Sequence, residues 1–303
     1  MSQSGLSAEE RDDLAELIED GEEETREEQG RDRHKDAEFQ FREPGHDFSD
    51  VVAMDHLKRM LVDKVQNPIE DREEYQRYGI QGCINGVLLY GPPRTGKSFL
   101  AEGFAGEAGY NYVKVNASDI KDPRVGVSEK NVKALVQQAV KFQPCIVQVD
   151  EIEGLSGSRE GESHSHKQDL VGVFLNEMEE LEEEDAVIIG TTNHPGRIDE
   201  AFLQPGRFSE QFYVGLPSEQ MRIELIEQGL SQAEEEVLNL SEIDVDRAAE
   251  LTEGFTCGDI LQGAVYEAKL KALKRGDPIN NEHLLYGVEM TDRSVVSPEK
   301  YRL

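Results

Sequence analysis

The stretch from Gly91 to Ser98 constrains the possible fold of this chain most strongly. It reads Gly-Pro-Pro-Arg-Thr-Gly-Lys-Ser and fits the pattern G-x-x-x-x-G-K-[ST]. The apolar run 87–90 before it is typical of a buried strand, and the helix-forming stretch 99–108 follows it. Glycines let the backbone bring several N–H groups close to an anion, and the following helix directs its positive N-terminal end toward the same point. The stretch is therefore interpreted as a phosphate-binding loop (P-loop) rather than as a chance match in a Gly/Pro-rich turn.

A P-loop predicts ATP and Mg²⁺ as cofactors. Lys97 is expected to reach the β- and γ-phosphates, and the Ser98 hydroxyl is expected to help hold the Mg²⁺ ion. The residues expected to contact the nucleotide here are Gly91, Pro92, Pro93, Arg94, Thr95, Gly96, Lys97, Ser98 and Phe99.

The charge of the chain limits its partners. Its 303 residues include 32 Lys and Arg against 63 Asp and Glu, a formal net charge of −31, and such a field repels nucleic acid. So acidic a surface is tolerated best in a salt-rich cytoplasm, because molar salt shortens the Debye length to roughly 3 Å. The sequence shows neither a long apolar membrane span nor a signal-peptide pattern, so a cytoplasmic location is expected.

Three regions of the chain differ in pattern. Residues 1–43 are acidic and poor in aliphatic side chains, which is typical of a disordered tail. In 44–217, apolar strands alternate with amphipathic helices, which predicts an α/β P-loop NTPase fold, a parallel sheet with flanking helices. Pro68 is expected to end the helix that begins near Met54. Residues 218–303 show helical patterns and predict a small all-helical lid domain. The expected strands are 86–90, 112–116, 145–149, 186–191 and 211–214.

Polar residues follow two of these strands. Asp150 and Glu151 follow the third strand; Asp150 is expected to orient the Mg²⁺ shell, and Glu151 to act as general base on the attacking water. Asn193 follows the fourth strand and is expected to hold that water or to sense the γ-phosphate. Arg207 comes after a rigid Pro-Gly turn. Within one chain it would be an ordinary surface cation, whereas between subunits it could stabilise transition-state charge as an arginine finger.

Together these stretches resemble the AAA+ ATPases, in the branch that contains the proteasomal ATPases, the valosin-type unfoldases and the membrane-anchored ATP-dependent proteases. The similarity covers about residues 44–300. It implies that Asp50 and Val51 belong to a segment whose backbone contacts adenine. It also implies that Gly258, within 254–260, belongs to a lid segment that closes over the nucleotide.

The chain departs from the family pattern at four places. Arg94 stands where the family usually has glycine, and Gln204 stands where it usually has the first of two trans arginines, so that only Arg207 is left. Arg124 occupies the pore-loop position that usually holds an aromatic residue. Positions 52 and 53 lack the usual glycines. The second and third departures bear on the rate of hydrolysis and on the gripping of an unfolded chain.

Two functions are compatible with these features. The first is ATP binding and Mg²⁺-dependent hydrolysis that drives remodelling or unfolding of protein clients in a homo-oligomeric ring, expected to be a hexamer, in which Arg207 completes the neighbour's site. The alternative is a nucleotide-switched assembly factor or regulatory ATPase subunit that does not thread protein. The intact Lys97, Asp150, Glu151 and Asn193 favour an active ATPase, whereas Arg124 and Gln204 favour a specialised or slow one. A DNA-handling ATPase of the clamp-loader type is disfavoured by the net charge of −31.

Overall fold

The computed structural model describes residues 37–80, 86–156, 164–239, 243–294 and 296–301. The chain divides into two compact units, Met1–Glu38 and Phe39–Leu303. Most of the acidic tail predicted for residues 1–43 therefore lies outside the described residues. The domain boundaries predicted after residues 43 and 217 stay predictions, and the description below concerns the second unit.

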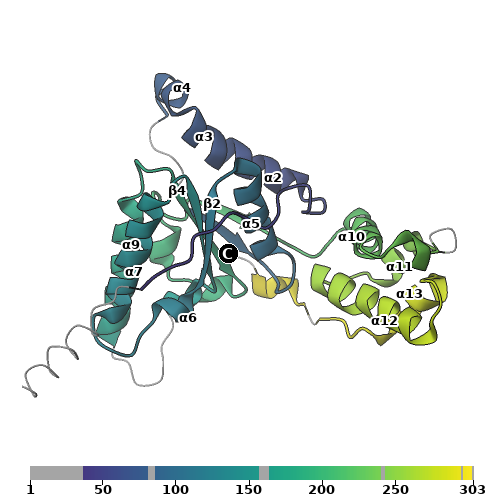
Figure 1. The fold of residues 1–303 in the computed structure, drawn as a ribbon. Coiled ribbons are helices and arrows are strands. Elements are labelled where there is room, and N and C mark those ends of the chain that lie inside the picture. The colour runs from purple at the N-terminus through teal and green to yellow at the C-terminus, as the bar shows by residue number, and fades with distance from the viewer. Residues whose placement is uncertain (1–36, 81–85, 157–163, 240–242, 295, 302–303) are drawn as a thin grey trace, which may run out of the picture. The chain divides into compact units, whose positions relative to one another are not determined.

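The centre of this unit is a five-stranded parallel sheet with the strand order β2-β3-β4-β1-β5 (Figure 1). The strands are β1 (Gly86–Tyr90), β2 (Asn111–Asn116), β3 (Cys145–Asp150), β4 (Ala186–Thr192) and β5 (Glu210–Tyr213). All the predicted strands are present, and their ends differ from the prediction by one residue at most. The predicted fold class, an α/β P-loop NTPase sheet with flanking helices, is confirmed.

The register of the sheet brings three chain segments to one edge. Tyr90 at the end of β1 pairs with Thr192 at the end of β4, and Val149 in β3 pairs with Gly190 in β4. Since all the strands run parallel, their carboxyl ends share an edge. The P-loop, Asp150 and the residues after β4 therefore lie on the same side of the sheet.

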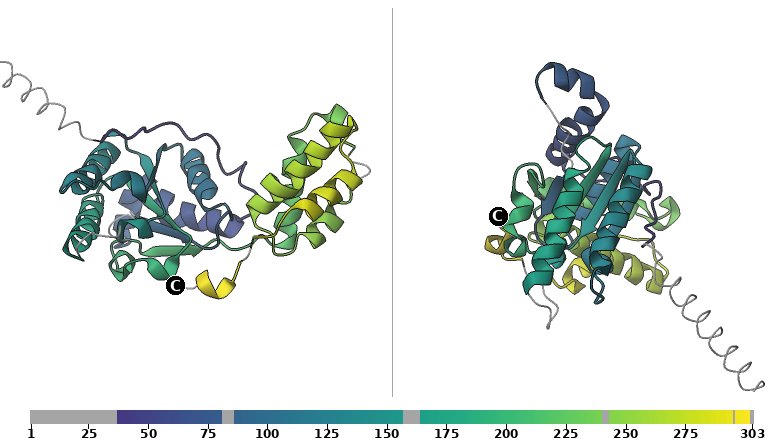
Figure 2. Two further views of the ribbon diagram at one scale, coloured as in Figure 1. Left: turned by 90° about the horizontal axis from the view of Figure 1, so that it is seen from below. Right: turned by 90° about the vertical axis from the view of Figure 1, so that its left-hand side faces the viewer.

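Helices cover both faces of the sheet (Figure 2). They are α2 (Asp55–Leu61), α5 (Lys97–Ala108), α6 (Ala117–Ile120), α7 (Val127–Lys141), α8 (Glu153–Ser156) and α9 (His164–Glu179). On one face, α7 and α9 pack side chains such as Leu135 and Phe174 against the strands. On the other, α2 and α5 contribute Leu61 and Phe104 to a second apolar cluster. Burial on both faces explains the near-continuous apolar strands.

The expectation that Pro68 ends the first helix is wrong. The helix α2 continues through a π-helical turn into α3, which contains Pro68 in its first turn and ends at Glu70. The proline has no N–H group to donate within the helix, and it lies just after the π-helical turn that interrupts the regular α-helical hydrogen bonding. The bounds of these segments are Val62–Gln66 for the π-helical turn, Asn67–Glu70 for α3 and Arg72–Arg77 for α4.

The part of the chain after β5 is helical and has an apolar cluster of its own, which includes Leu225, Ile260 and Leu284. Its longer helices are α10 (Glu219–Ser231), α11 (Val245–Leu251), a π-helix (Asp259–Val265), α12 (Tyr266–Arg275) and α13 (Asn281–Met290), and short 3-10 helices lie at Glu235–Val237 and Pro298–Tyr301. We call residues 219–290 the lid. Among the described residues, no helix combines the length and the apolar character that a membrane crossing requires.

Candidate functional site

The P-loop is fixed by its own backbone and by the chain after β5. Gly91 (φ 146°) and Gly96 (φ 96°) adopt conformations that favour glycine. A Cβ atom on Gly91 would overlap the carbonyl oxygen of Val214. The buried Thr95 hydroxyl lies 2.9 Å from the carbonyl oxygen of Pro92 and 3.1 Å from that of Val214. These contacts hold the loop in the curled form that can surround an anion.

Lys97, the first residue of α5, directs its ammonium group into the P-loop. Nζ donates to the carbonyl oxygens of Gly91 (3.0 Å) and Pro92 (2.6 Å). Burial lowers the pKa of Lys97 to about 8, although the charge of Asp150 acts in the opposite direction. An ammonium group that is buried against neutral carbonyl oxygens is stabilised when an anion replaces them as its partner.

Four side chains converge on the Asp150 carboxylate. The ammonium of Lys114 lies 2.7 Å from Oδ2, the Thr191 hydroxyl donates to Oδ1 over 2.7 Å, and the Ser98 hydroxyl lies 3.1 Å from Oδ1. The amide of Gln148 also donates to Oδ1. Burial raises the pKa of Asp150, but the hydrogen bonds from Lys114, Thr191 and Gln148 outweigh it, so this pKa lies below its ordinary value. Asp150 is therefore a carboxylate at neutral pH.

The oxygens of Ser98 and Asp150 suit a magnesium ion. Among the described residues, no group of three or more His, Cys, Asp or Glu side chains could hold a metal by itself. Mg²⁺ bound with a nucleotide takes one or two protein ligands and fills its octahedron with phosphate and water oxygens. A hydroxyl and a carboxylate that touch at the end of the P-loop provide ligands of this kind, so the residues fit the ion.

A buried polar pair supports Asp150 from inside the sheet. Gln148 in β3 and Tyr112 in β2 are fully buried. The Tyr112 hydroxyl donates to Gln148 Oε1 over 2.7 Å, which fixes the orientation of the amide whose nitrogen contacts Asp150. The sequence analysis missed both residues. The signal that could have revealed them is a glutamine in the middle of an apolar strand.

The P-loop, the strand ends and the lid line one cavity of about 710 Å³, a size suited to a small-molecule ligand. The predicted site residues that line it are Asp50, Val51, Arg94, Gly96, Lys97, Ser98, Phe99, Asp150, Glu151, Asn193 and Gly258. Glu151 is exposed and has a φ of 54°, an uncommon left-handed conformation for a residue with a side chain. Lining residues that the sequence analysis missed include His46, Thr191, Met221, Gln228, Leu261 and Gln262.

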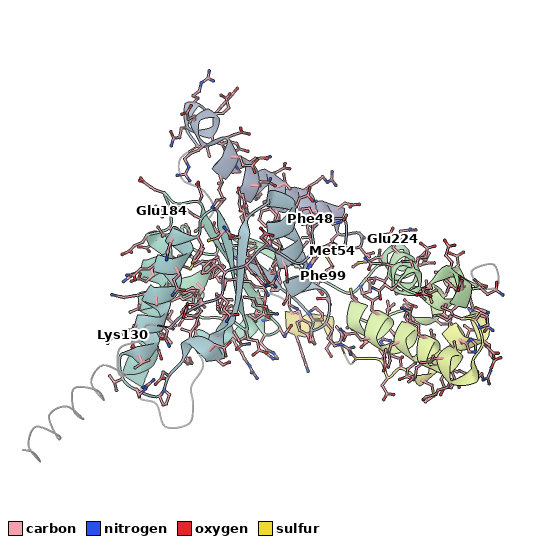
Figure 3. All side chains as sticks on the ribbon, in the orientation of Figure 1. Phe48, Met54, Phe99, Lys130, Glu184 and Glu224 are labelled. Carbon is pink, nitrogen blue, oxygen red and sulfur yellow. The ribbon has the colours of Figure 1, made fainter. Side chains whose placement is uncertain are left out.

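Aromatic and apolar groups form one wall of the cavity. The rings of His46 and Phe99 stack with centroids 3.8 Å apart and an interplanar angle of 12°. Met54 and Phe99, both labelled in Figure 3, line the cavity as well. The carbonyl oxygen of Asp50 accepts a hydrogen bond from Gln228 of the lid over 2.8 Å. This wall provides flat, apolar surface of the kind that packs against a planar base.

Some predicted residues lie outside the cavity lining. Gly91, Pro92, Pro93 and Thr95 belong to the P-loop without lining the cavity. Arg207 is also absent from the lining; its guanidinium donates to the carbonyl oxygen of Ala201 over 2.9 Å and lies 3.4 Å from the Glu179 carboxylate. Within one chain, the structure does not bring Arg207 to the other predicted site residues.

Known proteins are similar to this chain in sequence. Residues 87–216 match the family described as "ATPase family associated with various cellular activities (AAA)". The chain is 32% identical over 236 residues to the Cell division cycle protein 48 homolog of Archaeoglobus fulgidus, covering 76% of this chain and 31% of that protein. It is 35% identical over 261 residues to ATP-dependent zinc metalloprotease FtsH 1 of Conexibacter woesei, covering 84% of this chain and 38% of that protein.

A third relative is the Probable 26S proteasome regulatory subunit 10B of Caenorhabditis elegans, which is 32% identical over 240 residues, covering 77% of this chain and 57% of that protein. The chain thus spans between 31% and 57% of the length of these three relatives. The parallel sheet with its P-loop defines a nucleotide-binding α/β protein. The family match then shows that the chain carries an AAA ATPase domain over residues 87–216, and the relatives share this sequence similarity.

The buried pair beneath Asp150 yields a stability prediction. Gln148→Leu should lower the free energy of unfolding by about 1–3 kcal/mol, because the Tyr112 hydroxyl and the Asp150 carboxylate each lose a buried partner. Adding Tyr112→Phe should recover part of that loss, since the phenyl ring needs no acceptor. Denaturant unfolding of the two single variants and the double variant measures this coupling. Destabilisation of the double variant by the sum of the single effects would contradict it.

Proposed function

We propose that the chain binds ATP in the 710 Å³ cavity and hydrolyses it with the help of Mg²⁺. Hydrolysis then drives the remodelling or unfolding of protein clients. The working assembly is a homo-oligomeric ring, which we expect to be a hexamer. The observation that carries the proposal is the gathering of Lys97, Ser98, Asp150, Glu151 and Asn193 around that one cavity. The family match supports ATP as the nucleotide.

Each group has a role that follows from its chemistry. Lys97 exchanges its carbonyl contacts for the β- and γ-phosphates, and the P-loop N–H groups bind the remaining phosphate oxygens. Ser98 and Asp150 would hold Mg²⁺, which when bound neutralises phosphate charge. Glu151 takes the proton of the attacking water, and Asn193 orients that water. The exposure of Glu151 supports this role, because a catalytic base must reach solvent-derived water.

Two substitutions separate binding from hydrolysis. Lys97→Ala should abolish ATP binding because it removes the phosphate charge pairing, whereas Glu151→Gln should keep binding and lower the turnover rate by about 10²–10⁴-fold through loss of the base. ATP binding by calorimetry and phosphate release measure the two effects. Glu107→Gln on the exposed surface of α5 is the matched control. Wild-type turnover in Glu151→Gln would refute the assignment of the base.

The ring is the assembly that gives Arg207 access to a nucleotide. Within its own chain Arg207 lies outside the cavity and contacts Ala201 and Glu179. The Glu179 contact is long at 3.4 Å, and a surface ion pair of this kind holds its partners weakly. A neighbouring subunit's phosphates would compete for the guanidinium, and head-to-tail contacts that close on themselves generate a ring.

Removing Arg207 should slow hydrolysis without impairing the fold. Arg207→Ala is expected to retain ATP binding and to lose about 10³–10⁵-fold in turnover, the worth of a trans arginine. Arg77→Ala, which removes an exposed arginine of α4, serves as control. Mixing Arg207→Ala with Lys97→Ala subunits should restore some activity at mixed interfaces. If a mixed assembly that contains both subunits shows no recovery, Arg207 acts in cis or only structurally.

The alternative function, a nucleotide-switched assembly factor or regulatory subunit that does not thread protein, is favoured by the loop at Arg124. The Arg124 guanidinium binds Asp122 through Nε (2.8 Å) and Nη2 (2.8 Å). These hydrogen bonds raise the pKa of Arg124. An arginine that is paired in this way is less available to grip an acidic chain. Val125 beside it is 83% exposed and offers an apolar contact in place of an aromatic ring.

Asp122→Asn and Arg124→Ala distinguish the two functions. Asparagine at 122 can keep the turn bond to the Arg124 N–H, yet it releases the guanidinium. If the loop grips acidic clients, stimulation of the ATPase by an unfolded acidic protein should rise severalfold in Asp122→Asn and vanish in Arg124→Ala. Equal stimulation in both variants and the wild type would exclude an Arg124 grip and favour the assembly-factor function.

The net charge of −31 supports protein rather than nucleic acid as the client class. It also supports a cytoplasmic location in a salt-rich cell, where short screening lengths relieve the repulsion between carboxylates.

A further inference from the structure

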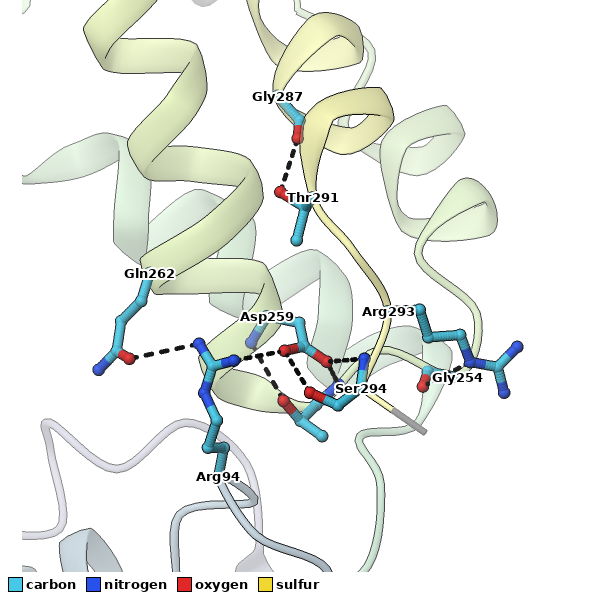
Figure 4. Close-up of polar contacts among 9 residues, drawn as sticks. Arg94, Gly254, Asp259, Gln262, Gly287, Thr291, Arg293 and Ser294 are labelled. Atoms are coloured by element: carbon cyan, nitrogen blue, oxygen red, sulfur yellow. Dashed lines mark hydrogen bonds and ion pairs between the residues drawn. The ribbon is translucent and has the colours of Figure 1, made fainter. Parts of the chain in front are cut away.

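Arg94 connects the P-loop to the lid. It adopts a φ of 60°, a left-handed conformation that favours glycine. Its side chain leaves the loop toward the π-helix of the lid, where Nη1 lies 2.7 Å from Asp259 Oδ1 and Nη2 lies 3.4 Å from Gln262 Oε1 (Figure 4). The two ion-paired residues are 165 positions apart in the sequence. A strained backbone that presents a side chain to a distant charge points to a specific role for that side chain.

Asp259 is a buried anion that is organised to receive the guanidinium. Its side chain is 0% exposed. Oδ2 accepts hydrogen bonds from the N–H groups of Thr256 (3.0 Å) and Ser294 (3.2 Å), and Oδ1 accepts one from the Ser294 hydroxyl (2.8 Å). Burial raises the pKa of Asp259, but these hydrogen bonds outweigh it, so the pKa lies below its ordinary value. The fixed carboxylate therefore presents a full negative charge to Arg94.

The lid backbone is adapted to the same contact. The Gly258 N–H donates to the carbonyl oxygen of Arg94 over 3.0 Å. A Cβ atom on Gly258 would lie 2.5 Å from Arg94 Nε, so only glycine leaves room for the guanidinium to pass. The thiol of Cys257, the residue before Gly258, lies 3.4 Å from the carbonyl oxygen of Thr95. Contacts of both the main chain and the side chains therefore join the P-loop to the lid.

We propose that Arg94 is a positioning residue that ties the lid to the P-loop and thereby sets the rate at which nucleotide leaves the cavity. The inference rests on the proposed nucleotide site. Arg94, Gly258 and Gln262 all line the cavity. A nucleotide held between the P-loop and the lid loses its lid contacts when these surfaces separate, and their separation breaks the Arg94–Asp259 ion pair. The ion pair therefore adds to the barrier for product release and couples the phosphate loop to movement of the lid.

Two variants cut this connection in different ways, and a third serves as the control. Arg94→Gly removes the guanidinium and fits the φ of 60° without strain. Asp259→Asn removes the charge but can keep an acceptor for the N–H groups of Thr256 and Ser294. Ser294→Ala is the matched control, because it removes a hydrogen bond to Asp259 without touching Arg94.

The rate at which a fluorescent ADP analogue leaves the cavity is measured in a stopped-flow instrument, where excess ATP displaces the analogue. Arg94→Gly and Asp259→Asn should each speed release by about tenfold, the scale of one charge-assisted hydrogen bond. The double variant should release the analogue no faster than either single variant. Arg94→Lys should release it more slowly than Arg94→Gly, because lysine restores the positive charge. The release rate of Ser294→Ala should stay within about twofold of the wild type.

Three results would overturn the proposal. Wild-type release in Arg94→Gly would show that the ion pair does not control departure. Multiplied effects in the double variant would mean that Arg94 acts on the phosphates directly. Equal acceleration in Ser294→Ala would trace the effect to disorder around Asp259.

A second measurement, made without nucleotide, keeps the proposal separate from the function it rests on. Amide hydrogen exchange of the peptide that contains Gly258 should rise about tenfold in Arg94→Gly and in Asp259→Asn, because the lid opens more often. If the wild type failed to bind ADP, the proposed function would fail while this exchange still reported on the contact. Unchanged exchange in both variants would refute the connection itself.

Discussion

The parallel pairing of β1, β4 and β3 is the constraint on which the candidate site depends. It places the P-loop, Asp150 and the residues after β4 at one edge of the sheet. Because side chains alternate between faces, a shift of β3 by one residue would turn Gln148 and Asp150 to the opposite face and separate them from Thr191. The apolar clusters on both faces fix this register, since the same shift would move β3 side chains such as Val147 and Ile146 out of their clusters. Packing of the core and chemistry of the site are therefore specified together.

The site contains buried charged groups, and these groups differ in how well hydrogen bonds and ion pairs stabilise their charge. Asp150 and Asp259 are satisfied by several donors each, and their pKa values lie below the ordinary range despite burial. Lys97 instead contacts neutral carbonyls, and its pKa falls to about 8. Fully paired groups act as fixed points, whereas a buried cation with neutral partners is prepared to exchange them for an anion. The electrostatics thus divide the site into a rigid frame and a group that can bind phosphate.

Local patterns in the sequence predicted much of this frame. The P-loop motif and the apolar runs of the strands depend on neighbours in the chain, so their positions follow from the sequence, and Asp150, Glu151 and Asn193 line the cavity as their places after strands suggested. Pairings between distant segments were not predictable in this way. The hydrogen bond from Tyr112 to Gln148 depends on which strands are neighbours, and the contact of Arg94 with Asp259 spans 165 positions. No local rule reveals either.

A crystal structure of the chain with Mg²⁺ and a non-hydrolysable ATP analogue tests the central claim most directly. We expect Lys97 Nζ to lie within hydrogen-bond distance of a β- or γ-phosphate oxygen, with the metal bound by Ser98 Oγ and with Asp150 in its surroundings. A triphosphate bound outside the P-loop would contradict the proposed site. So would a bound nucleotide that leaves Lys97 on the carbonyl oxygens of Gly91 and Pro92.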